Sequence, residues 1–163
     1  MVATGTPGAG GHGTHDVKCQ NLEAHGLVIS KKHVVALTVA TTLTGSDSGA
    51  TFIITSSGGA YDITLPVNAA KYKGVYYRFV CGAVLSSGAV SIKATTSEII
   101  YGRVTEGEVD TGDNAPGSAS GTGATNLILG TTCQTGDRID MVSDGTNWFI
   151  NGMIQKDAAL TTS

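Results

Sequence analysis

Short runs that alternate between apolar and polar side chains are the feature that most constrains the fold of this chain. In AYDITLP, residues 60–66, Tyr61, Ile63 and Leu65 alternate with polar residues. Successive side chains of a β-strand point to opposite faces of a sheet, so this pattern predicts a strand with one buried face. Similar runs recur along the chain, and Gly- and Ser-rich turns such as GSDSG and SSGG separate them. The sequence therefore indicates an all-β protein.

The spacing of these runs predicts about ten short strands with turn signals every eight to twelve residues. That spacing is typical of a β-sandwich, a jelly roll or a small barrel, and we expect a single β-sandwich or jelly-roll-like domain. One helical turn is expected over residues 67–74. The predicted strands cover residues 26–30, 33–44, 50–55, 60–66, 75–81, 88–95, 98–104, 126–131, 136–144 and 147–153.

The 163 residues suffice for one domain with a substantial core. Residues 1–24 form a Gly- and Thr-rich arm without strand periodicity before Val17, and such an arm is either disordered or ordered against a partner. Residues 25–163 are expected to form the domain. Within it, residues 106–125 are acidic at the front and rich in Gly and Ser behind, which predicts a long loop.

The charge pattern argues against several classes of partner. The formal net charge is −3, and Lys31-Lys32 is the only adjacent basic pair, so no nucleic-acid footprint is present. No apolar stretch approaches the roughly 20 residues of a membrane span, and the N-terminus lacks the pattern of a signal peptide. We expect synthesis in a cytosol-like compartment. Cys19, Cys81 and Cys133 then predict free, mostly buried thiols, with one disulfide or a reactive thiol as the alternative.

No motif in the sequence predicts catalysis or a cofactor. GAGGHG, residues 8–13, matches the dinucleotide fingerprint, but no strand precedes it and no helix follows it. His12 and His15 could ligate zinc together with Cys19, yet a fourth ligand is missing at any recognisable spacing. We therefore expect a protein that is not an enzyme and holds no cofactor or metal.

Acidic residues gather in TEGEVDTGD, at the start of the predicted loop. Glu106, Glu108, Asp110 and Asp113 could supply an acid/base pair or ligate calcium, but their spacing departs from that of a calcium loop. An exposed acidic loop is the favoured interpretation.

The aromatic residues divide between a core role and a binding role. SDGTNWFING predicts a hairpin that turns at Asp144-Gly145, with Trp148 anchored in the core. Tyr76 and Tyr77 should point to opposite faces of one strand. With Tyr101 and other aromatics they could instead form a platform that stacks on sugars. The residues predicted to form the structural core are Phe52, Leu65, Phe79, Ile139, Trp148 and Ile150.

Two long stretches resemble proteins of tailed-bacteriophage virions. LTVATTLTGSDSGATFIITSSGGAYDITLPVNAAKYKGVYYRFV combines TLT-x-x-DSG-x-TF, an ITLP strand and an aromatic strand ending in YRFV, and GDRIDMVSDGTNWFINGM resembles the final hairpin of the same group. Together they span residues 37–153. The group includes capsid decoration (cement) proteins and β modules of tail fibres.

The resemblance implies a structural virion protein on the outer capsid surface, made in the cytoplasm of a host bacterium. Its expected partners are the major capsid protein and copies of itself in a homotrimer, with neither nucleic acid nor membrane. The alternative is a tail-fibre or spike module that binds a host glycan. The arm, the basic pair and the acidic loop supply the expected contact residues, which are Val2, Thr6, Pro7, His12, His15, Lys31, Lys32, Glu106, Glu108 and Asp110.

Overall fold

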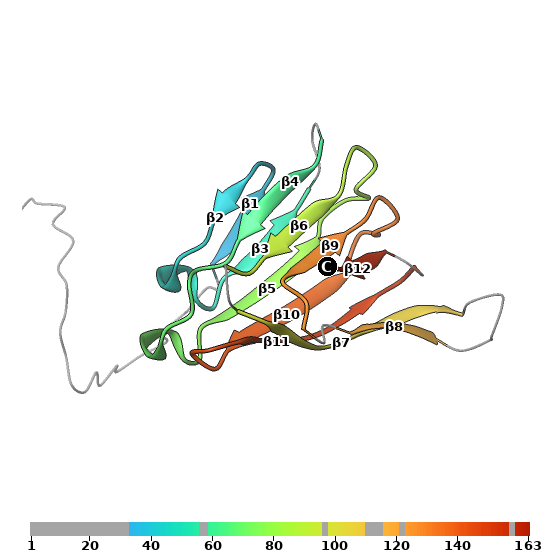
Figure 1. Cartoon of the computed structure of the whole chain (residues 1–163). Helices are drawn as coiled ribbons and strands as arrows, with labels where there is room; N and C mark the ends of the chain where they lie inside the picture. Colours follow the sequence, from blue (N-terminus) through green and yellow to red (C-terminus); the bar gives the residue numbers. More distant parts are fainter. Residues whose placement is uncertain (1–32, 56–58, 96–97, 110–115, 121–122, 157–158) are drawn as a thin grey trace, which may run out of the picture. The chain divides into compact units, whose positions relative to one another are not determined.

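The computed structural model gives an all-β protein whose two sheets pack against each other (Figure 1). The described part of the chain contains twelve strands and two 3₁₀ turns. The all-β sandwich expected from the sequence is thereby confirmed. The structure describes residues 33–55, 59–95, 98–109, 116–120, 123–156 and 159–163, except for the side chains of 108–109 and 116–120.

The larger sheet has seven strands in the order β1-β3-β5-β10-β11-β7-β8. They are β1 (Val34–Leu37), β3 (Thr51–Ile54), β5 (Tyr76–Cys81), β10 (Arg138–Ser143), β11 (Trp148–Ile154), β7 (Ile100–Val109) and β8 (Pro116–Ser120).

The smaller sheet has five strands in the order β12-β9-β6-β4-β2. They are β12 (Leu160–Thr162), β9 (Asn126–Leu129), β6 (Val90–Lys93), β4 (Tyr61–Thr64) and β2 (Thr41–Thr42). The 3₁₀ turns are η1 (Gly45–Asp47) and η2 (Ala70–Tyr72), and η2 lies inside the segment where one helical turn was expected.

Strands β1 to β6 wind alternately through the two sheets. As a result β1, β3 and β5 are parallel neighbours in one sheet, and β2, β4 and β6 are parallel neighbours in the other. Parallel strands need a crossover connection, and each crossover here runs through a strand of the opposite sheet. These pairs and the parallel pair β7–β11 set the fold apart from a jelly roll, whose strands are antiparallel.

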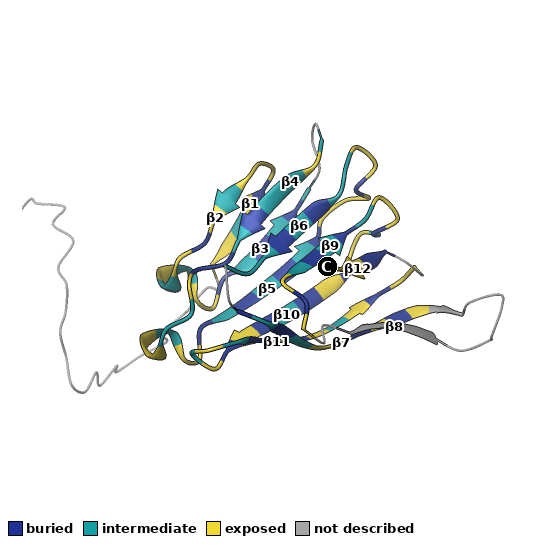
Figure 2. Cartoon of the chain, in the orientation of Figure 1, coloured by how far each residue is buried: buried dark blue, intermediate teal, exposed yellow. Residues whose placement is uncertain are grey.

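The core lies between the sheets and is built on aromatic residues of the larger one. Phe52 stacks on Phe79 with ring centroids 5.5 Å apart, and Tyr77 stacks on Trp148 at 5.6 Å. Figure 2 shows how buried residues alternate with more exposed ones along β5, β10 and β11. All six residues predicted for the core are buried, namely Phe52, Leu65, Phe79, Ile139, Trp148 and Ile150.

Two tyrosine hydroxyls tie the core to connecting segments. Tyr61 donates to the carbonyl oxygens of Leu37 at 2.8 Å and Thr55 at 3.1 Å, and Tyr77 donates to that of Thr44 at 2.6 Å. Burial raises the pKa of Tyr61 to about 12 and raises that of Tyr77 as well, so both hydroxyls keep the proton that they donate.

The hairpin predicted at Asp144-Gly145 joins β10 to β11, which are antiparallel. Its loop is held by the Asp144 carboxylate, which accepts from the backbone N–H groups of Thr146 and Asn147, both at 2.7 Å. Gly145 has φ +93°, a conformation that glycine adopts without steric cost. The local sequence therefore determines this turn.

Two expectations about the strands and loops are wrong. Residues 33–44 are not one strand, because the chain crosses between Leu37 and Thr41 to the other sheet and leaves Val39 64% exposed. Residues 106–125 are not one long loop, because β7 extends to Val109 and pairs with β8. In addition, β12 follows the last predicted strand, and its Leu160 is buried. The strand predicted at residues 26–30 lies outside the described residues.

Candidate functional site: the outer face of the seven-stranded sheet

The outward-facing sides of the two sheets differ in chemistry. On the five-stranded sheet the outward side chains are mostly short and polar, and Lys93 pairs with Asp62 at 2.7 Å. This is the composition of an ordinary solvated sheet face. Its outward residues, by strand alternation, are Thr42, Asp62, Thr64, Ser91, Lys93, Asn126, Ile128 and Thr161.

The outer face of the seven-stranded sheet instead carries a row of apolar and aromatic side chains. Tyr76, Val142, Phe149 and Tyr101 are direct cross-strand neighbours on β5, β10, β11 and β7. Val142 is 40% exposed and Phe149 is 41% exposed, and the rings of Phe149 and Tyr101 stack at 5.8 Å. We call these four residues the apolar row. Contiguous exposed apolar side chains of this kind are characteristic of interaction surfaces.

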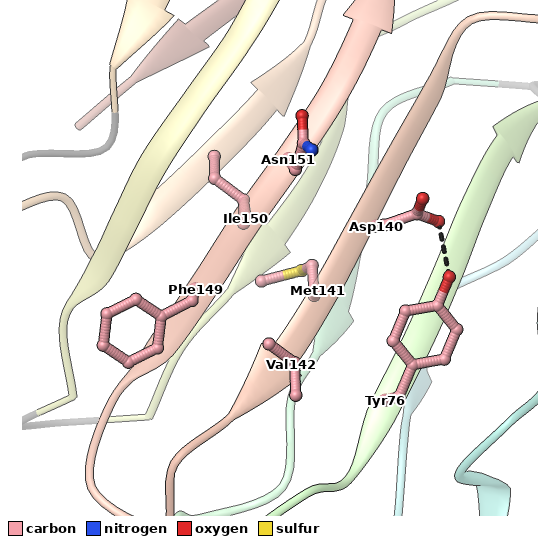
Figure 3. Close-up of a pocket in the computed structure, with 7 residues that line it drawn as sticks. All are labelled: Tyr76, Asp140, Met141, Val142, Phe149, Ile150 and Asn151. Atoms are coloured by element: carbon pink, nitrogen blue, oxygen red, sulfur yellow. Dashed lines mark hydrogen bonds between the residues drawn. The ribbon is translucent and has the colours of Figure 1, made fainter.

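A shallow hollow of about 210 Å³ lies at this row. Figure 3 shows Phe149 and Tyr76 on either side of Val142, with the Tyr76 hydroxyl directed at Asp140. The hollow is open, and β10 and β11 line most of it. Its shape suits one apolar side chain of a partner better than an enclosed small molecule. It is lined by Tyr76, Asp140, Met141, Val142, Phe149, Ile150 and Asn151.

A polar row lies beside the apolar row, two residues along each strand. It runs across Arg78, Asp140, Asn151 and Arg103. Asp140 Oδ1 lies 2.6 Å from Arg78 Nε, and Asp140 Oδ2 lies 3.1 Å from Arg78 Nη2. The Tyr76 hydroxyl donates to the same carboxylate at 2.8 Å. This network fixes the orientation of Tyr76 at the edge of the hollow.

The network also determines the charge of Asp140. Burial by itself raises the pKa of this carboxyl, but hydrogen bonds from Arg78 and Tyr76 outweigh burial, and the pKa is lowered. Hydrogen bonding to Asp140 raises the pKa of the Arg78 guanidinium. Both groups are therefore charged at neutral pH, as a half-buried ion pair.

A third row completes the face and adds positive charge. Arg138 lies opposite Met153 in the register, and Met153 is 61% exposed. Arg138 Nε is 3.8 Å from Asp140 Oδ2. The described side chains of this face include one carboxylate, that of Asp140, and three guanidinium groups, those of Arg78, Arg103 and Arg138.

Of the contact residues predicted from the sequence, only Glu106 has a described side chain, and it does not lie on this face. Glu106 is 5% exposed, so the expectation of an exposed acidic residue is wrong there: strand alternation places it on the same side as the buried Ile100 and Val104. Glu108 lies on β7, and its side chain is not among those described. Outside the described residues lie Val2, Thr6, Pro7, His12, His15, Lys31, Lys32 and Asp110.

Sequence reasoning weighed Tyr76 and Tyr101 as part of a sugar platform, but it missed the aliphatic and charged residues that lie beside them on this face. One signal was available in the sequence of the last hairpin. Val142, Phe149 and Met153 alternate with the core residues there, and in a strand with one solvated face such positions are usually polar.

Two of the buried acidic groups of the described chain, those of Glu98 and Asp137, hold loops in place. The Glu98 carboxylate accepts from the Asn68 N–H and from the Thr95 N–H and hydroxyl. Asp137 accepts from the N–H groups of Gln134 and Gln155, both at 2.8 Å. Both carboxylates are thus satisfied by local donors. Within the part of the chain that the structure describes, no three His, Cys, Asp or Glu side chains gather where they could hold a metal ion.

Cys81 and Cys133 are buried free thiols that contact each other. The pKa of the Cys133 thiol is raised, mainly by a hydrogen bond with Cys81 and secondly by burial. Its nucleophilic thiolate form is therefore disfavoured. Both agree with the buried thiols expected from the sequence, and Cys19 lies outside the described residues.

None of the helices in the described residues has the length and apolarity needed to cross a membrane. The fold and its outer face together define a β-sandwich with an open, partly apolar surface. Comparison of the chain with known protein families, with curated proteins and with solved structures gives no match.

Proposed function

We propose that this chain is a structural virion protein that decorates and stabilises the outer surface of a phage capsid by bridging capsomers. In this proposal it is not an enzyme, it acts as a homotrimer, and its partner is the major capsid protein, with no nucleic acid or membrane involved. It is made in the bacterial cytoplasm and resides on the capsid surface. The resemblance of residues 37–153 to virion proteins supports this class.

One structural observation carries the proposal, namely the outer face with its apolar row, which no described strand covers. Protein interfaces are enriched in aromatic residues, Met and Arg, and this face presents Phe149, Tyr101, Met153 and Arg103 together. A broad face with an open hollow suits a large and shallow contact with another protein.

Co-sedimentation with undecorated heads of the phage that encodes the chain tests the proposal, together with light scattering of the free protein. We expect saturable binding at a few copies per capsomer and the mass of a trimer in solution. Free protein that stays in the supernatant at all concentrations would contradict capsid decoration.

A second candidate function is glycan binding by a tail-fibre or spike module. The observation that favours it is the stacked pair of Tyr101 and Phe149, which lies beside the hydrogen-bonding side chains of Asn151 and Arg103. Aromatic faces next to polar groups could hold a sugar ring. A glycan array tests this function, with Phe149→Ala as the variant: specific binding that the substitution removes supports it, and an array without signal excludes it.

A further inference from the structure

We propose that the outer face of the seven-stranded sheet docks an extended acidic segment of the partner protein. An apolar side chain of that segment occupies the hollow beside Val142, and a carboxylate two residues further along binds between Arg103 and Arg138. The inference rests on the proposed function, because it specifies the chemistry of the capsid surface that this face recognises.

The spacing of the rows sets the pattern in the partner. Along β10, the outward side chains of Val142, Asp140 and Arg138 follow one another at intervals of two residues. Two residues of a strand span about 6.8 Å. A partner segment in the extended conformation has the same interval, so a side chain over the apolar row is followed two residues later by one over the polar row.

The balance of charge selects a carboxylate. Asp140 already pairs with Arg78 through two contacts, at 2.6 and 3.1 Å, and accepts the Tyr76 hydroxyl. Arg138 lies at 3.8 Å from the same carboxylate and its side chain is 50% exposed. Arg103 is exposed, and among the described residues no ion pair engages it. Two guanidinium groups are therefore left with capacity for an anion, although the whole chain has a net charge of −3.

The two arginines flank a single strand. Arg138 on β10 lies opposite Met153, and Arg103 on β7 lies opposite Asn151, both on the intervening β11. Neighbouring strands are about 4.8 Å apart, so the two backbones are separated by about 10 Å. Arginine side chains are long enough to converge over β11 from both sides, and their forked donors match a carboxylate. The Asn151 amide adds a further donor between them.

The opposite face of the molecule provides a matched control. On the five-stranded sheet, Lys93 pairs with Asp62, and no apolar row accompanies that pair. Lys93→Gln removes the same unit of charge from the chain as Arg103→Gln does, but from a face outside the proposed docking surface.

The decisive experiment measures head binding by the full-length chain carrying Arg103→Gln, Arg138→Gln, both, or Lys93→Gln. We expect each arginine substitution to weaken binding about three- to tenfold and the pair to lower its salt dependence. The Lys93→Gln variant should bind as the unsubstituted chain does. Circular dichroism establishes that every variant is folded. Head binding that both arginine substitutions leave unchanged would overturn the proposed docking surface while leaving capsid decoration intact.

A second experiment does not depend on phage heads. A synthetic peptide of Leu-Thr-Glu-Thr repeats, with Lys in place of Glu as its control, is titrated into the ¹⁵N-labelled protein. We expect the acidic peptide alone to shift the Arg103 and Arg138 side-chain signals. If heads fail to bind but these shifts occur, the decoration function fails and the acidic docking surface stands. Shifts with oligogalacturonate but not with the peptide would overturn the protein partner in favour of an acidic glycan.

Discussion

Trp148 and Phe149 are adjacent on β11 but point to opposite faces of the sheet. We therefore expect truncation of Trp148 to lower mainly the stability of the protein and truncation of Phe149 to weaken mainly its binding to heads. Trp148 is fully buried and stacks on Tyr77 at 5.6 Å. Truncation of a buried aromatic residue to alanine costs about 3–5 kcal/mol. A domain of this kind has a total stability of about 5–15 kcal/mol, so Trp148→Ala removes a large part of it. At about 2 kcal/mol per molar urea, the midpoint of unfolding should fall by about 1.5–2.5 M.

Phe149 is 41% exposed and contacts Tyr101 across the strand pair. Its truncation loses one exposed aromatic stack and part of a buried surface, for which we expect about 1–2 kcal/mol. Binding to undecorated heads should nevertheless weaken about tenfold or more, because aromatic residues near the centre of an interface dominate its affinity.

The two measurements are urea unfolding followed by far-ultraviolet circular dichroism and co-sedimentation with heads. Circular dichroism is required because Trp148 is the only tryptophan and Trp148→Ala removes the fluorescent probe. The reasoning is refuted if Phe149→Ala destabilises the protein as much as Trp148→Ala does, or if it binds heads with unchanged affinity.

Three further predictions follow from other parts of the molecule. The pKa of Asp140 is lowered in the folded protein, so its contribution to stability is present above the unfolded pKa of about 4 and is lost as pH falls through the folded pKa. The difference in unfolding free energy between the unsubstituted chain and Asp140→Asn should therefore shrink when urea unfolding is repeated from pH 7 down to pH 2.5. A Cβ at Gly102 would lie 2.1 Å from the Ile150 carbonyl oxygen at φ +130°, whereas one at Gly49, with φ +85°, would meet nothing within 4 Å. Gly102→Ala should therefore lower the melting temperature far more than Gly49→Ala, which costs about 1–2 kcal/mol, and equal shifts would contradict the steric argument. Deletion of residues 1–24 should leave the unfolding transition unchanged and abolish sedimentation with heads, and a truncated chain that still sediments would show that the arm is dispensable.

Strand alternation predicts which side of a strand is buried, but it does not predict the sheet to which the strand belongs. Ile63 and Leu65 share one parity in the sequence and are both buried in the structure. Val35, Leu37 and Val39 share a parity too, yet the chain leaves the sheet after Leu37, and Val39 is exposed. The crossing depends on contacts with distant strands, which a local pattern does not encode.

The parallel pairing of the strands could not be predicted from the sequence for a related reason. Val34, Thr51 and Arg78 are register partners on consecutive parallel strands, but they lie 17 and 27 residues apart. Unequal intervals leave no repeat in the sequence. The hairpin at Asp144 was predictable because its hydrogen bonds join residues no more than three positions apart.

The candidate site was the least predictable part. Alternation assigns Val142 and Phe149 to the side opposite the core, but only the packed structure shows that no other described strand covers that side. The acidic segment drew attention because of its charge, whereas Glu106 is buried as part of a strand. Prominent charge in the sequence was therefore no guide to which described side chains form the exposed face.

The position of β7 in the larger sheet has a consequence for how the chain folds during synthesis. β7 ends at Val109, but its partner β11 ends at Ile154, and β10 and β11 separate it from β5. While the ribosome makes the intervening residues, strands β1 to β6 can form their parallel pairs, but of the described strands only β8 is then available to pair with β7. The larger sheet therefore closes only when the last hairpin inserts between β5 and β7. This late and long-range step predicts slow folding, during which the unpaired edges of β5 and β7 are the segments open to aggregation.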